Sequence, residues 1–169
     1  MSWPDKLDRE QFEIDGFIEA YARLPGSPRL TVVARGERPD FVVRDSDTKS
    51  EYGVELTSVY LDDKSVPLVH KTSTGRTDIP FDRERLEKYE SRLISAIAEK
   101  VRKAREGYDA TRPLILAIYV NEYIPIYLGR NELEAMVQRN EAEFDAIAPF
   151  SEVIFWNLGN GGVFQVRPR

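Results

Sequence analysis

The sequence predicts an α/β fold in which a central mixed β-sheet is flanked by helices. Two stretches, residues 5–24 and 82–107, repeat their apolar residues at three- and four-residue spacings, which is typical of amphipathic helices. Short apolar runs between and after them predict strands. The 169 residues suit one hydrophobic core, so we interpret 1–169 as a single domain.

The first half of the chain is predicted to form one helix and three strands. The helix occupies residues 5–24 and ends at Pro25 and Gly26, which cannot continue it. The three predicted strands are residues 29–34, 40–44 and 52–60. The polar cluster 45–50 separates the second and third strands and is typical of a hairpin loop.

The second half is predicted to begin with a long helix and a buried strand. Asp82 is a plausible N-cap for the helix, and Gly107 ends it. Residues 114–120 are continuously apolar, which is the pattern of a strand covered on both faces. We therefore expect this strand at the centre of the sheet.

The last part of the chain is predicted to form a helix and a hairpin. Asn131 and Glu134 resemble a capping box and open a helix that runs to about Ala148. The two closing strands are residues 152–158 and 163–166. The expected element order is thus αβββαβαββ.

Composition narrows the classes of function. The chain has no cysteine and one histidine, which excludes disulfides, zinc–cysteine sites and thiol nucleophiles. The formal net charge of −5 argues against a protein that coats nucleic acid by charge alone. No apolar stretch approaches the length of a membrane span, so we expect a cytoplasmic protein without a membrane partner.

Two acidic residues on the predicted hairpin carry the functional hypothesis. A loop centred between Asp47 and Thr48 places Asp40 opposite Glu55 on one face of the hairpin. Cβ atoms of directly opposed residues lie roughly 4.5–5.5 Å apart, and like charges there destabilise a sheet. A divalent cation would relieve this repulsion, because Mg²⁺ is commonly held by one or two carboxylates.

Two further carboxylates lie on the predicted first helix. At 100° per residue, Glu10 and Glu13 fall on its apolar face, although carboxylates usually point to water. They are therefore candidates for a buried polar role.

The motif resembles that of the PD-(D/E)xK (restriction-endonuclease-like) nuclease superfamily. The resemblance rests on Pro39-Asp40, then a hairpin, then Glu55-Leu56-Thr57. It extends to the αβββαβ order of the family core, to which this chain would add a C-terminal helix and β-hairpin. The resemblance covers about residues 5–120.

The resemblance implies a metal-dependent phosphodiesterase acting on DNA. In that interpretation Asp40 and Glu55 bind Mg²⁺ (or Mn²⁺), and the Leu56 carbonyl is a further ligand. Glu10 or Glu13 would supply the additional carboxylate that many members carry on the first helix.

The sequence departs from the family at the catalytic lysine, whose place is held by Thr57. A hydroxyl carries no positive charge, so it cannot stabilise a phosphorane as an ammonium can. Lys49 lies at the hairpin tip, and Lys88 falls on the outward face of the long helix. Of the cations in the connection 61–81, Lys71 is our choice for a substitute.

Simpler interpretations and a second function stay open. Asp40 or Glu55 alone would be an ordinary strand residue facing water, and the cations of 83–105 are matched by acids, as on a solvated helix. The alternative function is a catalytically inactive member of the same fold that binds a protein or nucleic acid, for example a toxin-neutralising or accessory protein. The sequence does not indicate an oligomeric state.

Overall fold

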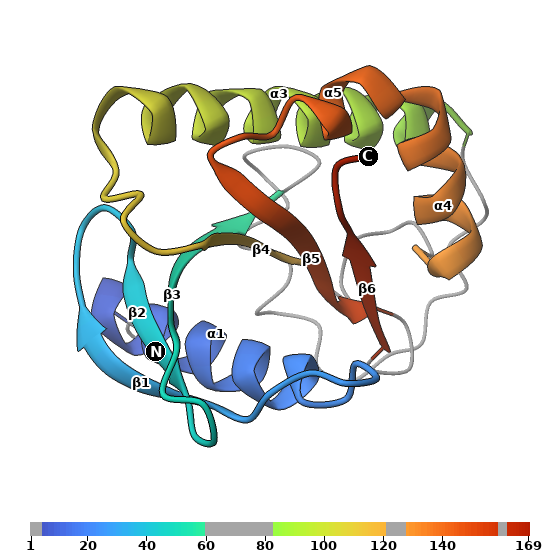
Figure 1. The fold of residues 1–169 in the computed structure, drawn as a ribbon. Helices are drawn as coiled ribbons and strands as arrows, with labels where there is room; N and C mark the ends of the chain where they lie inside the picture. The colour runs from blue at the N-terminus through green and yellow to red at the C-terminus, as the bar shows by residue number, and fades with distance from the viewer. Residues whose placement is uncertain (1–4, 60–82, 121–127, 159–161) are drawn as a thin grey trace.

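The structure is a computed structural model that describes residues 5–59, 83–120, 128–158 and 162–169. Its helices and strands, labelled as in Figure 1, are α1 (Lys6–Tyr21), β1 (Leu30–Arg35), β2 (Phe41–Asp45), β3 (Glu51–Ser58), α3 (Arg83–Gly107), β4 (Leu114–Tyr119), α4 (Arg130–Arg139), α5 (Glu141–Asp145), β5 (Phe150–Leu158) and β6 (Gly162–Val166). No helix in these ranges combines the length and apolar character that crossing a membrane requires.

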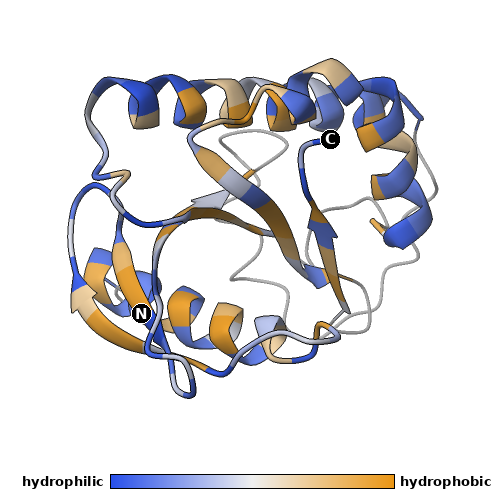
Figure 2. Cartoon of the chain, viewed as in Figure 1, coloured by the Kyte–Doolittle hydropathy of each residue, from blue (hydrophilic) through white to orange (hydrophobic). Residues whose placement is uncertain are grey.

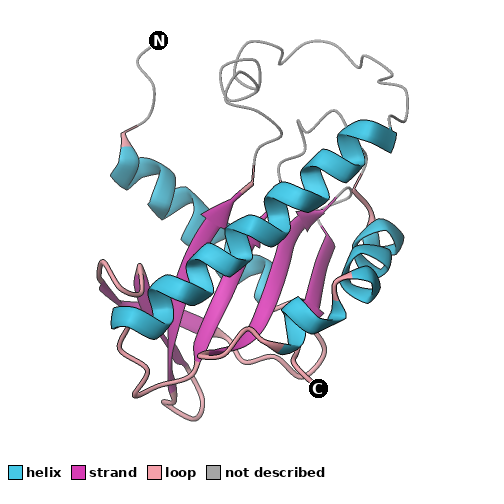
Figure 3. Ribbon diagram, turned by 90° about the horizontal axis from the view of Figure 1, so that it is seen from above, coloured by secondary structure: helices cyan, strands magenta, loops and turns pink. Residues whose placement is uncertain are grey.

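The fold is α/β, with a six-stranded mixed open sheet flanked by helices. The strands lie in the order β1-β2-β3-β4-β5-β6, and β3, β4 and β5 run parallel while the outer pairs are antiparallel. Helix α1 covers one face of the sheet, and α3, α4 and α5 cover the other (Figures 1 and 3). The expected mixed sheet flanked by helices is confirmed.

Two hydrophobic clusters hold the layers together, one on each face of the sheet. The cluster under α3 includes Tyr89, Leu93 and Ile97, and the cluster under α1 includes Ile14 and Phe17. Strand β4 contributes alternate residues to both clusters, and it is hydrophobic for most of its length (Figure 2). The prediction that this strand is central and covered on both faces is confirmed.

The predicted last helix begins and ends differently in the structure. It consists of α4 and α5, which are separated at Asn140. Helix α4 is preceded by Gly129, whose N–H donates to Glu132 Oε2 at 3.0 Å. The predicted capping box of Asn131 and Glu134 is therefore wrong, and Glu134 instead forms an ion pair with Arg130 at 2.8 Å. The predicted N-cap Asp82 lies outside the described residues.

The register of the β2–β3 hairpin is the one that the loop position predicts. Phe41 pairs with Val54, and Val43 pairs with Tyr52. Phe41, Val43 and Val54 contribute to the cluster under α1. The other face of the hairpin, which carries Glu55, is turned toward α3.

A buried carboxylate at the start of β5 ties three parts of the chain together. Glu152 is 5% exposed. Its Oε1 accepts from the Tyr21 hydroxyl at the end of α1 at 2.8 Å. Its Oε2 accepts from Gln165 on β6 and from Arg167 at 3.3 Å. Both oxygens have donors, so the charge is compatible with its burial.

Gly53 of β3 gives Pro39 the space to pack against the sheet. A Cβ at this position would lie 2.7 Å from Pro39 Cγ and 2.5 Å from Leu114 Cδ2, which is closer than carbon atoms can approach. Pro39 is buried and immediately precedes Asp40. The absent side chain of Gly53 therefore helps to set the position of Asp40.

We expect Gly53→Ala to destabilise the protein by about 1–3 kcal/mol, because the methyl group overpacks the contact with Pro39 and Leu114. Urea denaturation followed by circular dichroism measures the effect. Gly107→Ala is the control, since its Cβ would meet only the flexible Arg38 guanidinium, at 3.4 Å. Equal stability of the Gly53 variant and the wild type would contradict the packing argument.

Candidate functional site

The candidate site lies where β2 stops pairing with β3. Phe41 is the first residue of β2, and the side chain of Asp40 before it takes over the hydrogen bonding to β3. Asp40 Oδ2 accepts from the Leu56 N–H at 2.9 Å, and Lys100 Nζ donates to the Leu56 carbonyl at 3.3 Å. The side chains of Asp40 and Lys100 thus satisfy the backbone N–H and C=O of Leu56, which a neighbouring strand would otherwise pair.

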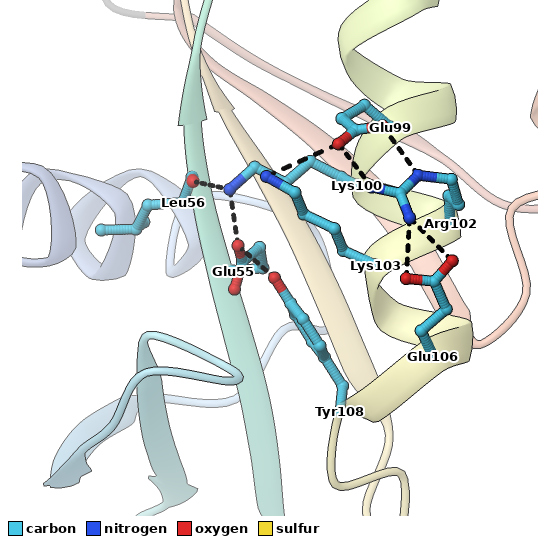
Figure 4. Close-up of polar contacts among 8 residues, drawn as sticks. All are labelled: Glu55, Leu56, Glu99, Lys100, Arg102, Lys103, Glu106 and Tyr108. Carbon is cyan, nitrogen blue, oxygen red and sulfur yellow. Dashed lines mark hydrogen bonds and ion pairs between the residues drawn. The ribbon is translucent and has the colours of Figure 1, made fainter.

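Glu55 is the most buried acid of the site. It is 2% exposed and points from β3 toward α3 (Figure 4). Its Oε1 accepts from Lys100 Nζ at 2.5 Å and from the Tyr108 hydroxyl at 2.6 Å. We refer to Asp40, Glu55, Leu56, Lys100 and Tyr108 as the carboxylate site.

The second oxygen of Glu55 is unsatisfied. Oε2 is buried and has no hydrogen-bond partner in the part of the chain that the structure describes. Buried polar atoms nearly always have a partner, so an orphaned carboxylate oxygen marks a position for a donor or a cation. Together with Asp40 and the Leu56 carbonyl it forms a set of oxygen ligands, which suits Mg²⁺ or Mn²⁺.

The pKa of Asp40 is raised by its surroundings. Burial, and after it the negative charges of Glu55 and Glu10, raise the pKa of Asp40 from 3.8 to about 6, while the Leu56 N–H and Lys100 oppose the change. The dominant cause is that this carboxylate is partly removed from water. The Leu56 N–H and Lys100 therefore compensate the charge of the Asp40 carboxylate only in part.

The structure places the two glutamates of α1 near Asp40 without joining them to it. Glu13 Oε1 accepts from the Ser58 hydroxyl at 3.2 Å, and burial raises the Glu13 pKa. Glu10 is bound by Lys6 at 3.4 Å. No cluster of three or more acidic, histidine or cysteine side chains with metal-binding geometry occurs within the described ranges, so neither glutamate completes a three-carboxylate group with Asp40 and Glu55.

The other residues chosen from the sequence have different outcomes. Thr57 is half-buried on β3 and pairs with Ile118. Lys71 lies outside the described residues. Lys88 points outward as predicted, with a side chain that is 64% exposed and an ion pair to Glu84 at 3.0 Å.

Sequence reasoning missed Lys100, although a pattern in the sequence could have indicated it. Lys100 lies three residues after Ile97 and four before Ala104, both buried, so it shares the apolar face of α3. The same test drew attention to Glu10 and Glu13. Tyr108 lies four residues after buried Ala104 and so continues the same spacing, but it follows Gly107, where the helix was predicted to end.

The remaining cations of α3 behave as a solvated helix surface. Arg102 bonds to Glu99 at 2.8 Å and to Glu106 at 2.7 Å, and Lys103 pairs with Glu99 at 3.6 Å (Figure 4). These pairs agree with the predicted helix of intrahelical ion pairs. Lys100 differs from them because its ammonium is directed to the sheet.

We expect Asp40→Asn to stabilise the metal-free protein at pH 7.5 and to leave its stability unchanged at pH 4. The folded chain retains a proton that the unfolded chain releases between about pH 4 and the Asp40 pKa of about 6, so wild-type stability falls as pH rises through that window. Asparagine keeps an acceptor for Leu56 and removes the charge.

The expected gain above pH 6 is on the order of 1 kcal/mol, because partial exposure screens the charge. Urea denaturation in EDTA across this pH range measures it. Asp47→Asn, an exposed acid of the same hairpin, is the control and should show no such pH dependence. A gain of equal size at pH 4 would mean that packing, not charge, is responsible.

Comparisons of the chain with protein-family models, with curated proteins and with solved structures found no match. Function is therefore inferred from the residues and geometry of the carboxylate site and from the motif that they form.

Proposed function

We propose that this protein is a metal-dependent nuclease that hydrolyses phosphodiester bonds of DNA. The observation that carries the proposal is the buried Oε2 of Glu55, which has no hydrogen-bond partner among the described residues and lies beside Asp40 in a site that also contains the Lys100 ammonium. Two acids on the β2–β3 hairpin and a lysine beside them are the groups that the PD-(D/E)xK resemblance requires.

A divalent cation fits the donors that are present. Glu55 Oε2, Asp40 and the Leu56 carbonyl would hold Mg²⁺ or Mn²⁺, whose preferred ligands are oxygens. When bound, such a cation supplies Lewis-acid polarisation of the phosphate and activation of water at neutral pH. The positive charge would also offset the burial and the neighbouring negative charge that raise the Asp40 pKa.

Lys100 supplies the charge that Thr57 cannot. It reaches the site from α3 rather than from β3, and its ammonium lies beside Glu55. An ammonium next to the acids would hold a phosphate oxygen and stabilise the negative charge that develops during hydrolysis. Tyr108 orients the Glu55 carboxylate by donating to its Oε1.

The order of the elements supports the same proposal. The run α1-β1-β2-β3-α3-β4 has an antiparallel three-strand meander followed by a parallel strand, as the resemblance to the restriction-endonuclease-like core implies. Fold similarity alone does not establish activity, and the carboxylate site therefore carries the argument.

The second candidate is an inactive member of this fold that binds a protein or nucleic acid. It is favoured by the ion pair in which Lys100 Nζ lies 2.5 Å from Glu55 Oε1, because this pair already neutralises one of the two acids. A protein of this kind would have kept the strand arrangement and lost the need for a cation. Metal binding separates the two candidates.

We expect Mg²⁺ or Mn²⁺ to raise the melting temperature of the wild type and to have no effect on Asp40→Ala or Glu55→Ala. A ligand that binds only the folded state stabilises it by mass action, by about 2.7 kcal/mol at a hundred times its Kd. Thermal-shift titration measures this, with Asp47→Ala as the matched control that keeps the response. A wild type that shows no shift would remove the basis of the nuclease proposal.

We expect the wild type to nick plasmid DNA with Mn²⁺ and Lys100→Met to lose about 10²–10³-fold of this activity, because the ammonium stabilises transition-state charge. Single-turnover assays on gels measure the rate. Lys71→Met tests the lysine chosen from the sequence and should retain wild-type turnover. The reverse result, with activity lost only in the Lys71 variant, would refute the assignment to Lys100.

A further inference from the structure

We propose that Lys100 is the resident cation of the metal-free carboxylate site, and that a divalent metal binds by displacing its ammonium from Glu55 and Leu56. The inference rests on the proposed function for the identity of the metal ligands. It adds that one side chain has two successive positions, the first on the acids and the second on the substrate phosphate.

The geometry of the ammonium is the first support. Lys100 Nζ lies 2.5 Å from Glu55 Oε1 and 3.3 Å from the Leu56 carbonyl oxygen (Figure 4). Glu55 and the Leu56 carbonyl are also ligands in the proposed metal site. The lysine therefore bridges two groups that a cation would bridge.

The burial of the pair is the second support. The Glu55 side chain is 3% exposed and that of Lys100 is 24% exposed, so little water screens the charges. A divalent cation held by Glu55 and Leu56 would lie within a few ångströms of the ammonium and repel it strongly. The ammonium and the metal therefore cannot both bind these oxygens.

The unpartnered oxygen provides a starting point for the exchange. Glu55 Oε2 is not engaged by Lys100, and Asp40 carries a second carboxylate beside it. A metal can bind these two groups before the ammonium leaves. Tyr108 still donates to Oε1 after that departure, so the carboxylate keeps its orientation.

The released ammonium has a use in the proposed reaction. A lysine has a flexible four-carbon stem and three donors, so it can turn from Glu55 to a neighbouring phosphate oxygen. In the metal-free protein the same ammonium is bound to Glu55 and Leu56. The exchange would thus link metal binding to the availability of the catalytic lysine.

Isothermal titration of Mn²⁺ alone into metal-free protein tests the exchange. We expect Lys100→Met to bind Mn²⁺ at least about tenfold more tightly than the wild type, because the metal no longer competes with an ion pair. In EDTA its melting temperature should be lower by roughly 10 °C, since Glu55 loses its cationic partner, and Mn²⁺ should restore it. Lys103→Met is the matched control, because Lys103 is exposed and pairs with Glu99 at 3.6 Å outside the site.

A second variant guards against failure of Lys100→Met to fold. Lys100→Gln removes the charge and keeps a polar N–H donor on a side chain that is one bond shorter, and it should also bind Mn²⁺ more tightly than the wild type. Affinity equal to or weaker than wild type in both variants would overturn the inference, even if the wild type binds metal and cuts DNA.

The outcomes also separate this inference from the proposed function. Mn²⁺ binding by Lys100→Met but not by the wild type would support Lys100 as the resident cation of the site, but it would reject both the displacement of Lys100 by metal and the nuclease proposal, because the lysine would then be a permanent substitute for metal. Absence of Mn²⁺ binding in the wild type and in both variants would overturn both.

Discussion

The antiparallel pairing of β2 with β3 brings Asp40 and Glu55 together at the point where that pairing ends. The two acids cannot separate without breaking the hairpin register, and the register is held by apolar residues on the opposite face of the same strands. The hydrophobic cluster under α1 therefore supplies the stability that keeps two negative charges close. Every other contact in the carboxylate site can be understood as a response to this charge.

The donors that compensate this charge are distributed unequally between the two acids. Among the described residues, Glu55, the more buried acid, receives an ammonium and a hydroxyl on a single oxygen, whereas Asp40 receives one backbone N–H and keeps a raised pKa. An arrangement made only for stability would place a donor on each oxygen, as the structure does around Glu152. The contrast between Glu55 and Glu152 within one molecule is why we interpret the first as a ligand site and the second as structural.

Local patterns in the sequence were sufficient for the sheet and for the two acids. Alternation of apolar residues and a polar loop gave the register of the hairpin, and helical spacing placed Glu13 on the inward face of α1. They were not sufficient for Lys100, because its contact with Glu55 spans 45 positions and depends on how α3 crosses the sheet. The start of α4 was also mispredicted, since Glu132 and Glu134 are equally acceptable acids and only the chain direction at Gly129 decides between them.

The carboxylate of Glu152 has a consequence for how the ends of the chain depend on each other. Its donors come from the first helix, the last strand and the residue that follows that strand. Shortening the chain before Gln165 would leave a negative charge in the interior with the Tyr21 hydroxyl as its remaining donor among these three. The C-terminal segment is therefore part of the electrostatic balance of the interior, and its removal should disturb α1, whose first half carries Glu10 and Glu13.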